Sequence, residues 1–76
     1  MTYDDYKRLR EVLADDETVS TDFMCYLHGS NGKPISKPSL YRRVQGGKIS
    51  RPIVPGLWTW AQARADRAKL LEGAGR

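Results

Sequence analysis

Apolar residues recur along this chain with helical spacing in some segments and without it in others. Residues 2–15 form the first periodic segment, and Thr2 can cap its start. An apolar stripe follows from positions three and four apart: Tyr3, Tyr6, Leu9 or Arg10, and Leu13. We therefore expect an amphipathic helix over residues 2–15.

The next apolar run, residues 19–28, predicts a short second helix. Its side chains at residues 23–27 are too continuously apolar to define one face, so we expect most of them in the core. Gly29 is a natural stop, and residues 30–34 contain an Asn-Gly pair that is typical of a turn. A loop is therefore expected before the next helix.

Residues 36–45 predict a third helix, which completes a helix-turn-helix unit over residues 20–45. Ser36 is a suitable N-cap for it. Leu40 and Val44 lie four positions apart, so they can anchor one face to the core. Two glycines follow and are expected to stop the helix: Gly46 and Gly47.

Residues 49–60 are predicted to form a short two-stranded hairpin, or wing. Val54-Pro55-Gly56-Leu57 suits a type II turn, with Ile53–Val54 and Leu57–Trp58 as its arms. Thr59 and Gln62 then match a capping box, which opens a fourth helix over residues 60–72 with Gly73 as its stop. Core packing is the expected role of Trp58 and Trp60, rather than stacking on a single strand.

Charge divides the chain into two unequal parts. Up to residue 27 there are three basic and seven acidic residues, and the remainder has ten basic and two acidic residues. Between His28 and Ala65 there are seven basic residues and no acid. A cationic surface without internal neutralisation attracts polyanions, because each neutralised phosphate releases a counterion.

Composition narrows the function classes further. With 76 residues the chain is expected to form one domain, residues 1–76. Cys25 is the only cysteine and His28 the only histidine, so we expect a buried thiol, no metal, no cofactor and no enzymatic activity. No apolar stretch approaches the roughly 20 residues of a membrane span. A cytoplasmic, DNA-associated location is the matching expectation.

The order of the predicted elements is that of an α+β, mostly helical winged helix-turn-helix with an added N-terminal helix. In that fold the second helix of the unit enters the major groove and flanking groups hold phosphates. Arginine suits guanine or phosphate, and serine and lysine suit phosphate oxygens. The residues expected to contact DNA are Ser36, Lys37, Ser39, Arg42, Arg43, Lys48 and Arg51.

Other residues near this helix are expected to have structural roles. Tyr41 is expected to pack against the neighbouring helix rather than to contact DNA. A solvated face is the expected setting of three basic residues of the last helix: Arg64, Arg67 and Lys69.

Two segments carry a resemblance to a known family. The run Ile35-Ser36-Lys37-Pro38-Ser39-Leu40-Tyr41-Arg42-Arg43-Val44, followed by Gly47-Lys48-Ile49-Ser50-Arg51-Pro52-Ile53, resembles the small phage excisionases and AlpA-like regulators. These are winged-helix proteins related to the DNA-binding domain of MerR. The similarity covers about residues 21–71. The sequence departs from the family in its longer loop at residues 30–34, its short Pro-Gly wing and its acidic N-terminal helix.

The resemblance implies binding and bending of double-stranded DNA, with copies bound side by side and a phage integrase directed towards prophage excision. Repression of a nearby promoter is implied as well. The acidic residues 4–22 of one copy could then lie near the basic residues 64–69 of the next. Two alternatives stay open: a plain AlpA- or MerR-like transcriptional regulator, and a small phage protein-interaction module or inhibitor with a basic face.

Overall fold

The computed structural model describes residues 1–30 and 32–74, with side chains described as far as Lys69. The elements are, in order, α1 (Tyr3–Val12), β1 (Thr18–Ser20), α2 (Thr21–Leu27), α3 (Lys37–Gln45), β2 (Leu57–Thr59) and α4 (Trp60–Ala74). The two strands pair antiparallel. Helices make up about half of the chain, so the described residues form the predicted α+β fold.

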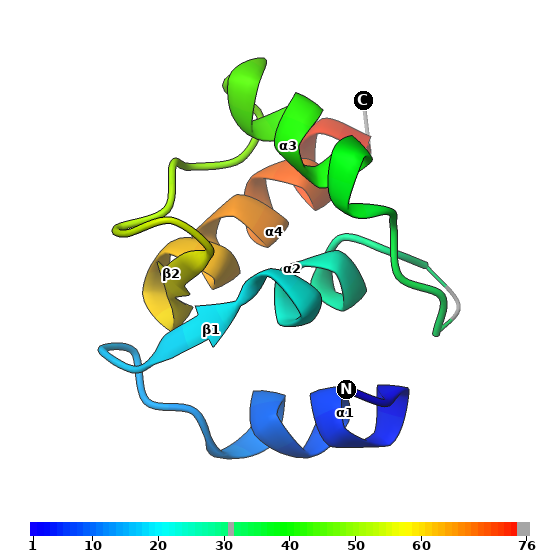
Figure 1. Ribbon diagram of the computed structural model, residues 1–76, viewed down its shortest axis with the longest axis vertical. Coiled ribbons are helices and arrows are strands. Elements are labelled where there is room, and N and C mark those ends of the chain that lie inside the picture. The colour runs from blue at the N-terminus through cyan, green and yellow to red at the C-terminus, as the bar shows by residue number, and fades with distance from the viewer. Residues whose placement is uncertain (31, 75–76) are drawn as a thin grey trace.

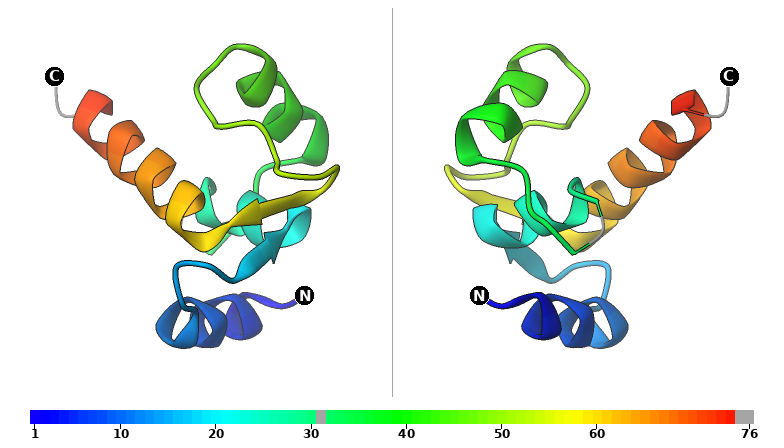
Figure 2. Two further views of the ribbon diagram at one scale, coloured as in Figure 1. Left: turned by 90° about the vertical axis from the view of Figure 1, so that its left-hand side faces the viewer. Right: turned by 90° about the vertical axis from the view of Figure 1, so that its right-hand side faces the viewer.

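The helices surround the small sheet on different sides (Figure 1). α1 lies at one end of the long axis of the molecule and α3 at the other, with α2 and the sheet between them. α4 leaves the sheet beside α2 and diverges from α3, so that the two helices form the arms of a V above α1 (Figure 2). The outer faces of α1 and α3 therefore lie at opposite ends of the molecule.

One cluster of buried side chains joins all the elements. Its fully buried members are Trp58, Phe23, Met24 and Leu40. The remaining buried members are Tyr6, Val19, Cys25, Leu27, Ile49, Trp60 and Ala63. Both tryptophans are thus in the core as predicted, and the ring of Trp60 meets that of Phe23 edge to face at a centroid distance of 5.5 Å. Neither tryptophan ring is therefore available to stack on a single strand.

α1 has the predicted N-terminus but is shorter than residues 2–15. Thr2 and Asp5 form a reciprocal capping box, and the hydrogen bond from the Thr2 amide lowers the pKa of Asp5. Only Tyr6 of the predicted stripe is buried, while Tyr3 and Leu9 are largely exposed. Tyr6 packs on the ring of Phe23 at a centroid distance of 5.0 Å, and Leu13, just after the helix, is half-buried against the same core.

The predicted second helix begins two residues later than expected, because its first part is a strand. Ser20 caps α2 by accepting a hydrogen bond from the Phe23 amide at 3.3 Å, which leaves Val19 outside the helix. Val19 pairs with Trp58 across the sheet, and Thr18 pairs with Thr59. A β-branched residue opposite a buried tryptophan suits a sheet better than a helix.

The predicted wing is confirmed in its turn but not in its first strand. The turn at residues 54–57 is present: the Leu57 amide donates to the Val54 carbonyl at 3.0 Å, and Gly56 has a φ of 82°. The pairing of Ile53–Val54 as a strand is wrong, because only an isolated bridge joins Val54 to Leu57. The strand partner of β2 is β1, which no local signal in residues 49–60 could indicate.

α4 starts at its predicted capping box. The amide and hydroxyl of Thr59 donate to the side chain of Gln62, whose own amide donates to Thr59 Oγ1 at 3.2 Å. The first two amides of the helix donate to the carbonyls of Glu17 and Asp15. The prediction that Gly73 ends α4 is wrong, since the helix runs to Ala74. Glycine inside a helix costs only about 1 kcal/mol, which its neighbours can offset.

Candidate nucleic-acid interface

α3 is fixed at both ends by the residues that the sequence singled out. Ser36 caps it by accepting a hydrogen bond from the Ser39 amide at 3.3 Å, and Pro38 lies in its first turn. At its C-terminus the amides of Gly47 and Lys48 donate to the carbonyls of Val44 and Arg43. With Gly47 at a φ of 79°, this pattern is a Schellman motif.

The orientation of α3 follows from its anchoring residues. Leu40 is completely buried and Val44 is packed against the core. The opposite face is exposed and carries Lys37, Pro38, Tyr41, Arg42 and Gln45. This face therefore points to solvent at the end of the molecule farthest from α1 (Figure 1).

The hydroxyl groups of Ser36 and Ser39 are hydrogen-bonded to each other in the first turn of α3. The hydroxyl of Ser36 donates to that of Ser39 at 2.9 Å and also accepts from the Ser39 amide. The proton of the Ser39 hydroxyl remains free to meet an external acceptor. The two serines lie on the flank of the exposed face.

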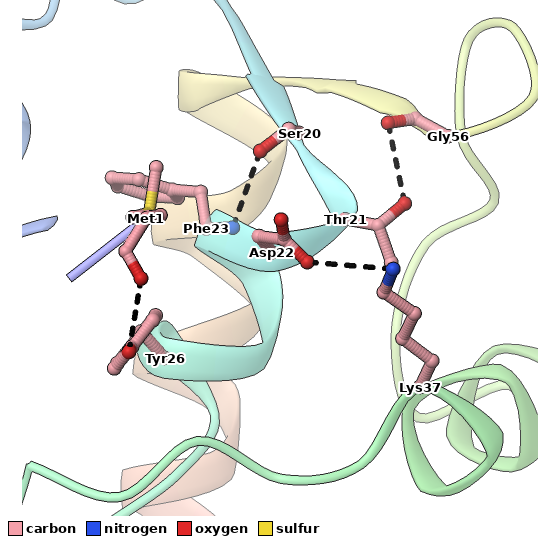
Figure 3. A network of polar contacts seen from close by, with 8 residues as sticks. All are labelled: Met1, Ser20, Thr21, Asp22, Phe23, Tyr26, Lys37 and Gly56. Carbon is pink, nitrogen blue, oxygen red and sulfur yellow. Dashed lines mark hydrogen bonds and ion pairs between the residues drawn. The ribbon is translucent and has the colours of Figure 1, made fainter. Parts of the chain in front are cut away.

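Lys37 is tied to the preceding helix by an ion pair. Its Nζ lies 3.6 Å from a carboxylate oxygen of Asp22, and both side chains are more than half exposed (Figure 3). An exposed pair of this kind contributes about 0–1 kcal/mol, so Lys37 can exchange Asp22 for a phosphate at little cost. A second pair joins Arg64 to Asp15 at 2.8 Å. The expectation of a cationic surface without internal neutralisation is therefore wrong for these two residues.

The two arginines of α3 have different surroundings. Arg42 is exposed, and among the described residues it forms no ion pair. Arg43 is half-buried, and its guanidinium donates to the carbonyl of His28 at 3.5 Å, at the C-terminal end of α2. A cation there is favoured by the helix dipole. The structure thus separates an outward-facing Arg42 from an Arg43 that joins α2 to α3.

Arg51 and Lys48 lie beyond the end of α3, and both are exposed. Arg51 lines a groove of about 470 Å³, hereafter the α3 groove. One wall of the groove is α3, through Tyr41, Val44 and Gln45, and the other is the turn at residues 52–56. Lys48 is not part of this lining.

Several residues of this face were missed or misjudged in the sequence. Tyr41 does not pack against the neighbouring helix as predicted: it is 42% exposed and lines the α3 groove. Ile53 and Val54, read as strand residues, are 52% and 48% exposed at the rim. Gln45 was detectable, since it lies three and four positions after Arg42 and Tyr41 on one helical face.

Of the seven predicted contact residues, five lie at the helix face, its flank or the groove: Ser36, Lys37, Ser39, Arg42 and Arg51. Lys48 is exposed just beyond the end of α3 and outside the groove. Arg43 is directed towards α2. Cys25 is buried as expected, and burial raises the pKa of its thiol.

Within residues 1–30 and 32–74 no helix is long and apolar enough to cross a bilayer. No family model, curated protein or solved structure matches this chain.

Proposed function

We propose that this chain is a winged helix-turn-helix protein that binds double-stranded DNA with α3 as its recognition helix. The observation that carries the proposal is the exposed face of α3. It presents Lys37, Tyr41, Arg42 and Gln45 to solvent, while the buried Leu40 holds the opposite side. Arginine and glutamine are side chains that read guanine and adenine edges in the major groove.

The α3 groove suits one strand of the sugar-phosphate backbone. Its lining is mostly apolar, from Tyr41, Val44 and Ile53, which fits the apolar faces of deoxyribose. Arg51 at the same groove supplies donors for phosphate oxygens. With α3 in the major groove, the exposed turn at residues 53–55 would then reach the adjacent minor groove.

The finer function that we propose is that of an excision factor of a phage or prophage. Its support is the resemblance of residues 35–53 to the excisionases and AlpA-like regulators. Such a protein bends DNA, directs an integrase towards excision and can repress a promoter near its site. It acts as an architectural protein, without catalysis of its own.

The test of DNA binding is a gel-shift titration over a range of salt concentrations, with footprinting on the DNA that flanks its gene. The logarithm of the affinity should fall linearly with the logarithm of salt, with a slope of about −0.9 for each phosphate neutralised. Lys7→Ala on α1, at the far end of the molecule, is a matched control and should leave the slope unchanged. Salt-independent binding, or no footprint, would rule out the proposal.

A further inference from the structure

A second basic site lies away from α3, at the junction of α1, α2 and α4. A pocket of about 370 Å³ is lined by Arg10 of α1, Leu27 of α2, and Trp60, Arg64 and Arg67 of α4. We call it the arginine pocket. Three arginine side chains thus line the pocket together with two core side chains, Leu27 and Trp60.

A smaller pocket of about 290 Å³ adjoins the first, because Arg10, Leu27 and Arg67 line both. Its other walls are polar and aromatic, with Tyr3, Tyr6 and Tyr26. Arg10 lines both pockets, and its guanidinium donates a hydrogen bond to the hydroxyl of Tyr6 at 3.2 Å. An extended chain could therefore pass from an apolar pocket into a polar one beneath the same two arginines.

The arginine pocket already attracts one carboxylate. Asp15, in the loop after α1, pairs with Arg64 at 2.8 Å, although both side chains are largely exposed. Among the described residues, Arg10 and Arg67 have no acidic partner within ion-pair distance. Within the described residues, Arg67 and, beside its hydrogen bond to Tyr6, Arg10 thus retain donors for an external anion.

We propose that the arginine pocket binds an acidic segment of a partner protein, with a carboxylate on Arg67 and Arg10 and an apolar side chain over Leu27 and Trp60. Arginine clusters recognise acidic motifs through charge-assisted hydrogen bonds, and an adjoining apolar pocket supplies an anchor. A phosphate backbone would use the arginines as well, so the position of the pocket has to decide between the two partners.

The position of the pocket favours a protein partner over the same DNA duplex. α1, which supplies Arg10, lies at the opposite end of the long axis from α3 (Figures 1 and 2). A straight duplex on the exposed face of α3 would leave Arg10 uncovered. The pocket does not depend on the proposed DNA binding, and the two can fail separately.

The experiment measures fluorescence anisotropy of labelled octapeptides with the full chain. The panel combines Glu or Asp with Leu, Phe or Trp, and two matched sets replace every acid by its amide or every apolar residue by serine. At least one acidic-apolar peptide should bind, and both replacements should weaken it. Arg67→Ala should weaken binding by about tenfold, the scale of one lost charge-assisted hydrogen bond. The more exposed Arg64→Ala should weaken it less, because the Arg64 guanidinium is paired with Asp15. Lys69→Ala, at an exposed residue of α4 outside the pocket, should leave binding unchanged.

Removal of Asp15, which competes with the peptide for Arg64, should strengthen peptide binding instead of weakening it. Asp15→Ala frees Arg64 and should strengthen peptide binding by about two- to fivefold, the range for loss of an exposed ion pair. Binding to a duplex serves as the second readout, and it should respond to Arg42→Ala but not to Arg67→Ala. The proposal is overturned if no peptide of the panel binds, if the amide peptides bind equally well, or if Arg67→Ala weakens duplex binding as much as Arg42→Ala.

Discussion

Asp66 of α4 accepts two hydrogen bonds from Ser50, one from the backbone amide at 2.9 Å and one from the hydroxyl at 3.0 Å. The carbonyl of Ser50 in turn accepts a hydrogen bond from the indole of Trp58 at 2.8 Å. Asp66 is only 4% exposed, so these bonds are shielded from water. They fasten the segment after α3 to α4 and to β2, and thereby fix where the α3 groove begins.

Asp66→Ala should lower the free energy of unfolding by about 1–3 kcal/mol, because it leaves two half-buried donors of Ser50 without their acceptor. Asp66→Asn keeps one acceptor oxygen and should lose less. Urea unfolding followed by circular dichroism measures both. Equal stability of Asp66→Ala and the original chain would show that water replaces the carboxylate.

His28 should make the protein less stable in mild acid. Burial, together with the nearby Arg43, lowers its pKa to about 4, against about 6.5 in an unfolded chain. The unfolded state therefore takes up a proton first as the pH falls, and stability is lost between about pH 6.5 and 4. The loss should approach about 3 kcal/mol.

The check on His28 is a comparison of melting temperatures at pH 7 and pH 4.5 with those of His28→Leu. The variant removes the imidazole, whose two ring nitrogens have no hydrogen-bond partner among the described residues. It should keep more of its stability in acid than the original chain. Parallel losses in the two proteins would place the acid sensitivity in the carboxylates instead.

Gly29→Ala should be far more damaging than Gly47→Ala. A Cβ at Gly29 would overlap the backbone carbonyl of Lys33, in the bridged loop that joins α2 to α3. A Cβ at Gly47 would meet no atom within 4 Å, so that variant suffers only the strain of its φ of 79°, about 1–2 kcal/mol. Thermal melts of the two alanine variants test the difference. Similar melting temperatures would mean that the loop moves to accept the methyl group.

If the chain binds DNA as proposed, replacement of Arg42 should lower DNA affinity, whereas replacement of Arg43 should lower stability. Arg42→Ala removes an exposed side chain of α3 and should cost about 1–3 kcal/mol of specific binding with the melting temperature unchanged. Arg43→Ala removes the hydrogen bond to the His28 carbonyl and should instead lower stability, by about 1 kcal/mol. Gel shifts and melts on both variants distinguish these roles. The assignment of α3 fails if neither variant changes DNA affinity.

Cooperative binding to adjacent sites would distinguish an excision factor from a plain regulator. A bend of tens of degrees costs on the order of 1–6 kcal/mol, and a single small module buries a modest area on DNA. Several copies should therefore bind together. Since Asp15 pairs with Arg64 in the same chain, the exposed charges left for a neighbour include Asp16, Glu17 and Lys69.

The measurement is a gel-shift series on DNA with one, two and three sites, together with circular-permutation mobility. Cooperative filling with an anomalous mobility is the expected result. Independent filling with normal mobility would leave the transcriptional regulator as the better description.

Local signals in the sequence sufficed for the helix starts. Thr2, Ser36 and Thr59 each cap the helix that they were predicted to cap, because a cap depends on residues within one turn of the chain. Gly46 and Gly47 end α3 for the same reason. The anchoring of α3 by Leu40 was predictable too, since a spacing of four places it on the same face as Val44.

The sequence alone determined the order of the helices, the turn at residues 54–57 and the anchoring of α3 by Leu40, all of which depend on short-range backbone and side-chain chemistry. Only the tertiary structure decided that β2 pairs with Thr18–Ser20, that Arg43 contacts His28, and that Asp66 holds Ser50. These contacts join residues at least 15 positions apart. Their pairing is set by which surfaces the buried core brings together, and no local pattern records that.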